Sequence, residues 1–283
     1  MGSYRTSSVF KFTKDFELLK KIIRDGVIPN YCEENLSFED GTEFCVGIPM
    51  ASFCDIPITL LDEHNKRYGN YGIALRKEWA IEKGLTPVMY IANYDILKSV
   101  HYYHQHNEKE LNWFKREDVR KKMIEDTIFR GFPLEDYAKM MNAKQEHSLN
   151  THIIGYLKKY EGEFADDDII NYEENEWRFI VPDEDGSRWF WSKEDYMSWR
   201  NPQGKKISEV KKPSPSEGMR HYILKFTPGD ISYILLKDDE FKKKVIEFIK
   251  KLKMIGGNKI ADEKDKDDLI SKIVTLDQVK NDF

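Results

Sequence analysis

The stretch from Pro49 to Ile91 constrains the fold of this chain more than any other part of its sequence. The apolar run from Cys45 to Phe53 predicts an extended, largely buried strand, which ends in a turn at the Asp-Ile-Pro segment that follows. A strand at 73–75, a short helix at 77–83 and a buried strand at 88–91 come next. Short strands and helices therefore alternate in this region.

The rest of the chain alternates in the same irregular way. A strand at 9–13 precedes a helix that has Thr13 as its N-cap and ends at Gly26. We also predict strands at 151–156, 177–181, 221–226 and 231–236, and an amphipathic helix at 241–255. Irregular alternation favours a single α+β domain over residues 1–283, with a central twisted mixed or antiparallel sheet and flanking helices, rather than a doubly wound parallel sheet.

Two segments stand apart from this pattern. Apolar residues recur at near-helical spacing between residues 93 and 148, which predicts a helical insertion. Residues 201–218 are rich in proline, glycine and lysine, which is typical of an exposed, mobile connection.

The composition excludes several classes of protein. The 283 residues carry a net charge of −5, so there is no overall attraction to nucleic acid or to an anionic membrane. No apolar run reaches the roughly 18–20 residues that span a bilayer, and three cysteines are too few for a disulfide framework. We therefore expect a cytoplasmic protein with free thiols and no membrane association.

Standard signatures of cofactor and metal sites are missing from the sequence. There is no Walker phosphate loop, no G-x-G-x-x-G, no C-x-x-C and no H-E-x-x-H. His101, His104 and His106 form a cluster, but no further ligand stands at a metal-binding spacing, so we predict no metal. Cys54 stays open as a nucleophile, although a small buried cysteine is the commoner case.

The Tyr-Gly-x-Tyr-Gly motif at 68–72 has the ingredients of a ligand cleft. Its glycines permit positive φ or close approach of a ligand, and Tyr68 and Tyr71 can each supply a stacking face with a polar tip. Together with His64, which precedes the motif, they suit a flat, polar ligand. The alternative is that these residues simply pack two turns.

Glu174 and Glu176 place carboxylates at the start of a buried strand. Residues two apart on a strand point to the same face. A carboxylate at the mouth of a cleft can hold a ribose hydroxyl and stabilise an oxocarbenium-like centre. The alternative is an exposed strand end, with solvated acids and Arg178 in a surface ion pair.

These motifs, read in order, resemble a known family. They are Phe-x-Phe-Thr from Phe10, Gly-Val-Ile-Pro-x-Tyr-Cys-x-Glu from Gly26, Pro-Met-x-x-Phe-Cys-Asp-Ile-Pro from Pro49, His-x-x-x-Tyr-Gly-x-Tyr-Gly-Ile from His64, and Glu-Trp-Arg at 176–178. The chain resembles the AbiGi family of abortive phage-resistance proteins over most of its length. The resemblance implies a role in anti-phage defence, in which family members are described as antitoxin-like partners.

The layout also looks like that of ADP-ribosyltransferases of the DarT and poly-ADP-ribose polymerase type. In those proteins a first strand carries a motif similar to Phe10–Thr13, a second ends like Ser52–Phe53, and a later strand bears a catalytic glutamate that matches Glu176. Lys11 stands where that class has a histidine that hydrogen-bonds the NAD ribose. This resemblance implies an ADP-ribosyltransferase-like fold, but Lys11 puts catalysis in doubt.

From the two resemblances we expect a toxin that moves ADP-ribose from NAD to a nucleic-acid or protein acceptor. The catalytic residues would be Glu176 and Glu174, and NAD would be the substrate, with no metal. The expected NAD-binding residues are Lys11, Thr13, Ser52, Phe53, His64, Tyr68 and Tyr71. The alternative is a catalytically inactive antitoxin or sensor that binds a cognate partner protein.

Overall fold

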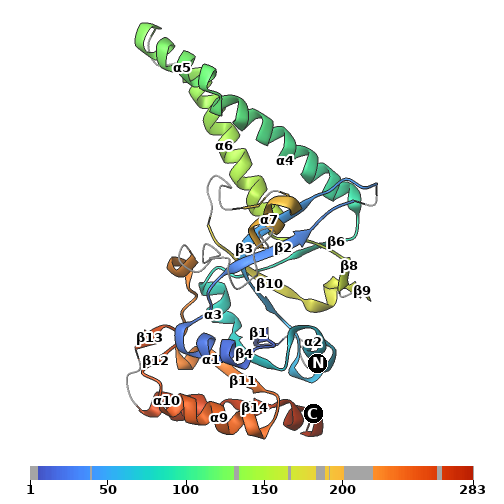
Figure 1. Ribbon diagram of the computed structural model, residues 1–283, viewed down its shortest axis with the longest axis vertical. Coiled ribbons are helices and arrows are strands. Elements are labelled where there is room, and N and C mark those ends of the chain that lie inside the picture. Colours follow the sequence, from blue (N-terminus) through green and yellow to red (C-terminus); the bar gives the residue numbers. More distant parts are fainter. Residues whose placement is uncertain are drawn as a thin grey trace.

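The protein is described from a computed structural model (Figure 1). It describes residues 6–38, 40–130, 134–164, 167–182, 189–190, 192–200, 219–259 and 263–282. The predicted mobile connection at 201–218 lies outside the described residues.

A mixed sheet forms the centre of the molecule. In the described residues it has eight strands, in the order β14-β11-β4-β1-β3-β10-β5, with β2 paired to β3. Their bounds are β1 (Ser8–Thr13), β2 (Asn30–Asn35), β3 (Cys45–Cys54), β4 (Tyr71–Arg76), β5 (Thr86–Pro87), β10 (Glu176–Ile180), β11 (Ile231–Leu236) and β14 (Ile273–Thr275). Only the β11–β14 pair among them is parallel. The predicted α+β class with a central mixed sheet is confirmed.

The sheet opens along one edge of β3. Met50 pairs with both β2 and β10, so these two strands lie on opposite edges of β3. Cys54 likewise pairs with both β1 and β10, which puts β1 on the same edge as β2. Because β2 leaves β3 at Met50 and β1 joins it only at Cys54, a gap remains beside residues 51–53.

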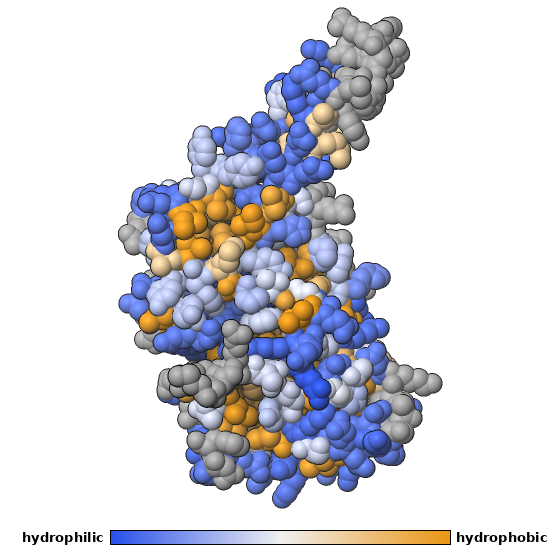
Figure 2. Space-filling view, turned by 180° about the vertical axis from the view of Figure 1, so that it is seen from behind, coloured by the Kyte–Doolittle hydropathy of each residue, from blue (hydrophilic) through white to orange (hydrophobic). Residues whose placement is uncertain are grey.

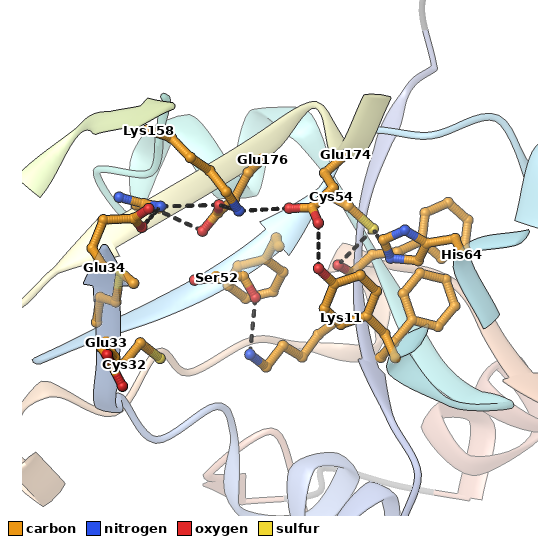
Figure 3. A pocket seen from close by; sticks show the side chains of 16 residues that line it. Lys11, Cys32, Glu33, Glu34, Ser52, Cys54, His64, Lys158, Glu174 and Glu176 are labelled. Carbon is orange, nitrogen blue, oxygen red and sulfur yellow. Dashed lines mark hydrogen bonds and ion pairs between the residues drawn. The ribbon is translucent and has the colours of Figure 1, made fainter. Parts of the chain in front are cut away.

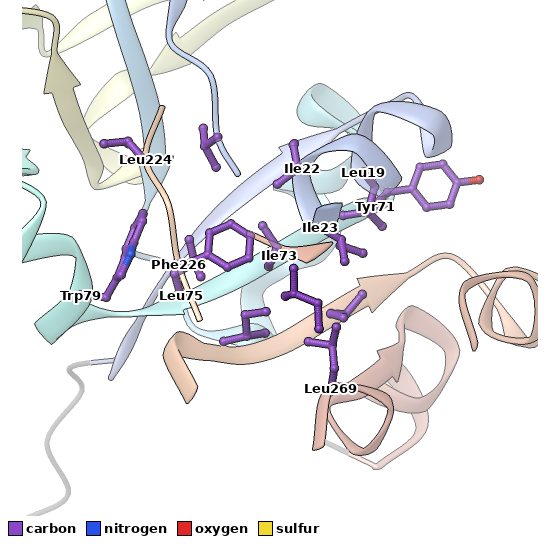
Figure 4. Packing of buried hydrophobic residues seen from close by; sticks show 14 of the residues in the cluster. Leu19, Ile22, Ile23, Tyr71, Ile73, Leu75, Trp79, Leu224, Phe226 and Leu269 are labelled. Carbon is purple, nitrogen blue, oxygen red and sulfur yellow. The ribbon is translucent and has the colours of Figure 1, made fainter. Parts of the chain in front are cut away.

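The main apolar core lies between the sheet and α1 (Phe16–Asp25), α9 (Asp239–Lys250) and α10 (Glu263–Ser271) (Figure 4). Leu19 and Ile23 of α1 pack in it with Ile73 of β4. Gly26 ends α1 as predicted, but its N-cap is Asp15, which accepts from the Glu17 N–H. Thr13 instead accepts from the Asp15 N–H at 3.0 Å, so the cap lies two residues later than predicted.

A helical arm projects from the sheet (Figure 1). It consists of α4 (Tyr94–Lys115), α5 (Glu117–Arg130) and α6 (Leu134–Gly155), and at its base β6 (Met89–Ile91) pairs with β7 (Leu157–Lys159). The predicted strand at 151–156 is wrong, because most of it forms the last turn of α6. Ile154 is fully buried there and Ile153 is partly exposed. An apolar pair of this kind fits a helix end as well as a strand.

The remaining elements connect or cover these parts. They are α2 (Leu61–Tyr68), α3 (Lys77–Glu82), α7 (Lys193–Arg200), α11 (Leu276–Asp282), β8 (Glu161–Phe164), β9 (Asp167–Ile170), β12 (Met254–Ile255), β13 (Asn258–Lys259) and the 3₁₀ turns η1 (Ile58–Leu60), η2 (Asn171–Glu174), η3 (Arg220–Tyr222) and η4 (Pro228–Asp230). The predicted strand at 221–226 is wrong, because this segment has only a single bridge from Leu224 to Val27. In the described residues no helix combines the length and apolar character needed to cross a membrane.

Candidate functional site

The gap beside β3 is occupied by a cavity of about 300 Å³ (Figure 3). Of the residues predicted for a site, it is lined by Lys11, Ser52, Phe53, His64, Tyr68, Glu174 and Glu176. Segments far apart in the sequence thus meet where β1 and β2 diverge. We call this space the carboxylate cavity.

Lys11 crosses the gap from β1 to β3. Its Nζ donates to the carbonyl oxygen of Ser52 at 2.9 Å and lies 5.8 Å from the centre of the Phe53 ring. A buried strand carbonyl without a neighbouring strand needs another donor. Lys11 therefore has a structural role in the gap between β1 and β3.

Glu174 and Glu176 converge although they do not share a strand. Glu174 ends η2, and Asn175 takes a left-handed conformation with φ 42°, so β10 begins only at Glu176. Both carboxylates nevertheless bind Lys158, at 2.6 Å from Glu174 and 2.8 Å from Glu176. The prediction that they share a strand face is wrong, but they do meet in one cavity.

Arg178 holds Glu176 from the other side. Its Nε and Nη2 donate to the two Glu176 oxygens at 2.8 and 3.1 Å, and Nη2 also donates to Glu34. Its Nη1 donates to the carbonyl oxygens of Gly155 and Leu157. Arg178 is 0% exposed, so the alternative of a surface ion pair is wrong. Glu34, Lys158, Glu174, Glu176 and Arg178 form what we call the carboxylate cluster.

Burial and pairing compete in the carboxylate cluster. Burial would raise the pKa of Glu176, but Arg178 and Lys158 together lower it below its usual range. Burial also opposes the charge of Lys158, yet Glu176, Glu34 and Glu174 raise its pKa. For Glu34 burial prevails over Arg178 and raises the carboxyl pKa. Glu176 and Lys158 thus stay charged at neutral pH, each neutralised by its neighbours.

Two tyrosines complete the hydrogen bonds around the glutamates. The Tyr68 hydroxyl donates to the Glu174 carboxylate, and the Tyr90 hydroxyl accepts from the Glu176 N–H at 2.7 Å. Burial raises the pKa of both phenols, so both stay protonated. The Tyr68 hydroxyl therefore orients a carboxylate of the cavity.

Cys54 and His64 lie together at the far end of the cavity (Figure 3). The Cys54 sulfur is 3.3 Å from His64 Nε2. Burial, followed by the charge of Glu174, raises the thiol pKa well above its ordinary value. Burial, with Arg67 and Lys158, lowers the His64 pKa to about 4. Both groups are neutral at neutral pH, which does not activate a cysteine nucleophile.

Two predicted ligand residues lie elsewhere. Thr13 stabilises the turn between β1 and α1. The Tyr71 ring packs in the main core, 5.4 Å from Phe16 and 5.0 Å from Phe241. Tyr71 is separated from Tyr68 because Tyr68 ends α2, whereas Tyr71 begins β4 after the intervening turn.

Sequence reasoning missed three members of the carboxylate cluster. Glu34 ends the Cys-x-Glu motif at 32–34, which was a usable signal. Lys158 had no signal, since it acts from the short strand β7 after the arm. Arg178 was noticed but placed at the surface.

The cavity offers hydrogen-bonding groups whose charges are largely paired with one another. In the part of the chain that the structure describes, no three His, Cys, Asp or Glu side chains are arranged to hold a metal ion. The arrangement suits a polar ligand without strong net charge. Both carboxylate oxygens of Glu176 are already bound by a cationic side chain.

Comparisons with known proteins agree with the family motifs. The model of the family described as "Putative abortive phage resistance protein AbiGi, antitoxin" matches residues 25–237. A curated relative, "Abortive phage resistance protein AbiGi" of Lactococcus lactis subsp. cremoris, is 26% identical over 90% of this chain and 99% of its own length. No solved structure matches. Since the family model covers well over half of the sequence, the chain belongs to the AbiGi family of abortive phage resistance proteins.

Proposed function

We propose that this chain is the antitoxin of an abortive-infection pair and acts by binding a partner toxin. The observation that carries the proposal is the family match over residues 25–237, whose description names an antitoxin. The relative from Lactococcus lactis is named only as a phage resistance protein, which is consistent with this role.

The state of Glu176 supports binding over NAD cleavage. A transferase glutamate has to accept a hydrogen bond from the ribose and face the positive charge that develops there. Here both oxygens of Glu176 accept from Arg178, and one of them also accepts from Lys158. Freeing an oxygen would leave buried cations unpaired, which costs several kcal/mol.

The arm offers a surface for the toxin. Ile96 of α4 and Ile153 and Leu149 of α6 are exposed apolar side chains, with Leu149 62% exposed. Figure 2 shows apolar surface gathered near the base of the arm. We assign the partner toxin to this face, because a protein partner can cover the exposed apolar side chains.

Co-expression with a toxin gene from the same defence locus tests the proposal. We expect the wild-type chain to restore growth, and Ile96→Asp/Leu149→Asp to lose that protection while remaining folded. Ile81→Asp is the matched control, because Ile81 is also exposed but lies on α3. Failure of the soluble wild-type chain to protect, or equal loss in the control, would contradict the proposal.

ADP-ribosyl transfer stays a second candidate. The observation in its favour is that Lys11, Ser52 and Glu176 line one cavity. It predicts that the chain is toxic when expressed alone and that Glu176→Gln removes the toxicity. An antitoxin is harmless when expressed alone.

A further inference from the structure

A second cavity, of about 520 Å³, lies near the opposite face of α2. His64 and Tyr68 of α2 line the carboxylate cavity, whereas Asn65 and Lys66 line the second one. Its lining residues are Lys14, Asn65, Lys66, Gly69, Asn70, Tyr71, Lys237, Leu276 and Lys280. We call it the lysine cavity.

The lysines of this cavity come from four separate elements. Lys14 follows β1, Lys66 belongs to α2, Lys237 follows β11 and Lys280 belongs to α11. Among the lining side chains that the structure describes, none is acidic. This convergence is unusual in a chain with a net charge of −5. It creates a local positive potential that favours an anionic ligand.

Asn65 is an independent sign of a ligand. It is only 5% exposed, it lines the lysine cavity, and neither its amide nitrogen nor its amide oxygen has a hydrogen-bond partner. Buried polar groups in native proteins are nearly always paired. An amide with both atoms unpaired beside a cavity marks a place where a bound group supplies the partners.

The Tyr-Gly-x-Tyr-Gly motif builds the floor of the lysine cavity. Gly69 has φ 110° and donates its N–H to the carbonyl oxygen of Asn65 at 2.9 Å. A Cβ at Gly69 would lie 2.3 Å from the carbonyl oxygen of Thr13. Only glycine lets the chain pass this close to the end of β1, which brings Lys14 next to Asn70.

We propose that the lysine cavity binds a small molecule that carries two or more phosphate groups. The cavity is wide enough for several phosphates, and lysine binds phosphate oxygens as a compact point charge. Asn65 can donate to one oxygen through its amide nitrogen. This inference goes beyond the proposed antitoxin role and does not rest on it. Inorganic polyphosphate and a nucleoside triphosphate share this chemistry.

Isothermal titration calorimetry of the full chain with sodium tripolyphosphate and with ATP tests the proposal. We expect both to bind, and Lys14→Ala/Lys237→Ala to weaken binding by at least about tenfold. Asn65→Asp adds a negative charge beside the phosphates and should weaken binding as well. Similar affinities for the two probes indicate recognition of the phosphates alone, and tighter binding of ATP adds contacts to the nucleoside.

A matched control separates the cavity from general charge. Lys109→Ala/Lys122→Ala removes the same charge from exposed positions on the arm and should leave binding unchanged. Circular dichroism confirms that each variant is folded. The proposal is overturned if tripolyphosphate gives no binding heat at millimolar concentration, or if both double variants lose affinity equally. It is also overturned if a single-stranded RNA binds about tenfold tighter than both probes, since that would assign the lysines to a nucleic-acid backbone.

Discussion

The carboxylate cavity and the lysine cavity, both beside α2, differ in how their charged side chains are paired. In the carboxylate cavity, the buried Arg178 and the largely buried Lys158 bind the glutamates around them. In the lysine cavity, Lys14 and Lys237 are exposed and no described lining residue is acidic. The charges of the carboxylate cavity are paired within the protein. The described lining of the lysine cavity supplies cations but no carboxylate, so an anionic ligand can pair with them.

Solvent explains the difference. A buried charge loses its hydration and has to be paired within the protein, whereas an exposed lysine keeps its water until a ligand replaces it. The carboxylate cluster therefore contributes to the fold, and the exposed Lys14 and Lys237 are available for binding. Substitutions in the buried cluster should therefore change stability far more than substitutions of the exposed lysines.

The largest effect is expected for Arg178→Met. This change removes the guanidinium and leaves Glu176 and Glu34 buried beside an apolar side chain. Removing one partner of a buried pair costs about 3–5 kcal/mol of unfolding free energy, which urea denaturation measures. Arg24→Met, in an exposed pair with Asp25, is the control and should change little. Similar losses of unfolding free energy in the two variants would mean that burial does not determine how much an ion pair contributes to stability.

Gly69→Ala tests the turn between the two cavities. Gly69 has φ 110° and ψ 167°, a region that is essentially restricted to glycine and costs other residues about 1–3 kcal/mol, and the new methyl group would also collide with the Thr13 carbonyl oxygen. We expect a total loss of about 3 kcal/mol, measured by thermal denaturation. Gly41→Ala is the matched control, because its φ is 85° but nothing lies within 4 Å of the added Cβ. Equal losses would show that the turn is not tightly packed.

His64 should make stability depend on pH. Its pKa is lowered from 6.5 to about 4, chiefly by burial. The unfolded chain therefore binds the proton first, so this contribution is complete above pH 6.5 and is lost as the pH falls toward 4. The loss is roughly 2 kcal/mol after discounting for partial exposure. His64→Gln should flatten the curve of unfolding free energy between pH 6.5 and 4, and His106→Gln, at an exposed position, should not. A curve unchanged by His64→Gln would mean that the imidazole is not desolvated.

The smallest effect is expected in the lysine cavity. Lys14→Met/Lys237→Met should change the unfolding free energy by no more than about 0.5 kcal/mol, because exposed lysines lose little hydration on folding. Any increase in the unfolding free energy comes from reduced repulsion between the lysines, so the increase should be smaller when denaturation is repeated in about 1 M salt. A large destabilisation would show that these lysines are paired within the fold.

The sequence predicted the class of fold better than its details. Apolar runs such as Cys45–Phe53 and Ile231–Leu236 mark strands reliably, because burial requires continuous apolar side chains. Ile153 and Ile154 were assigned to a strand because a two-residue apolar run does not separate the end of a helix from a strand. The segment at 221–226 has apolar residues but forms only one bridge. Whether such a segment joins a sheet depends on its neighbours, which local pattern does not report.

The candidate site was predicted only in part. Lys11, Ser52, His64, Tyr68, Glu174 and Glu176 line the same cavity, as their motifs indicated. Their roles depend on Lys158 and Arg178, whose charges decide what the glutamates can do. Lys158 follows a long helical arm, and no spacing rule connects it to residues so distant in the sequence.

Nicotinamide release from NAD tests most directly whether both oxygens of Glu176 are committed to Arg178 and Lys158. Wild-type protein and Glu176→Gln are incubated with NAD labelled in the nicotinamide ring, with nucleic-acid and protein acceptors present. We predict that neither releases nicotinamide above the level in buffer, because the glutamate oxygens are already bound by cations. Release by the wild type that disappears in Glu176→Gln would contradict this account and establish the cavity as a transferase site.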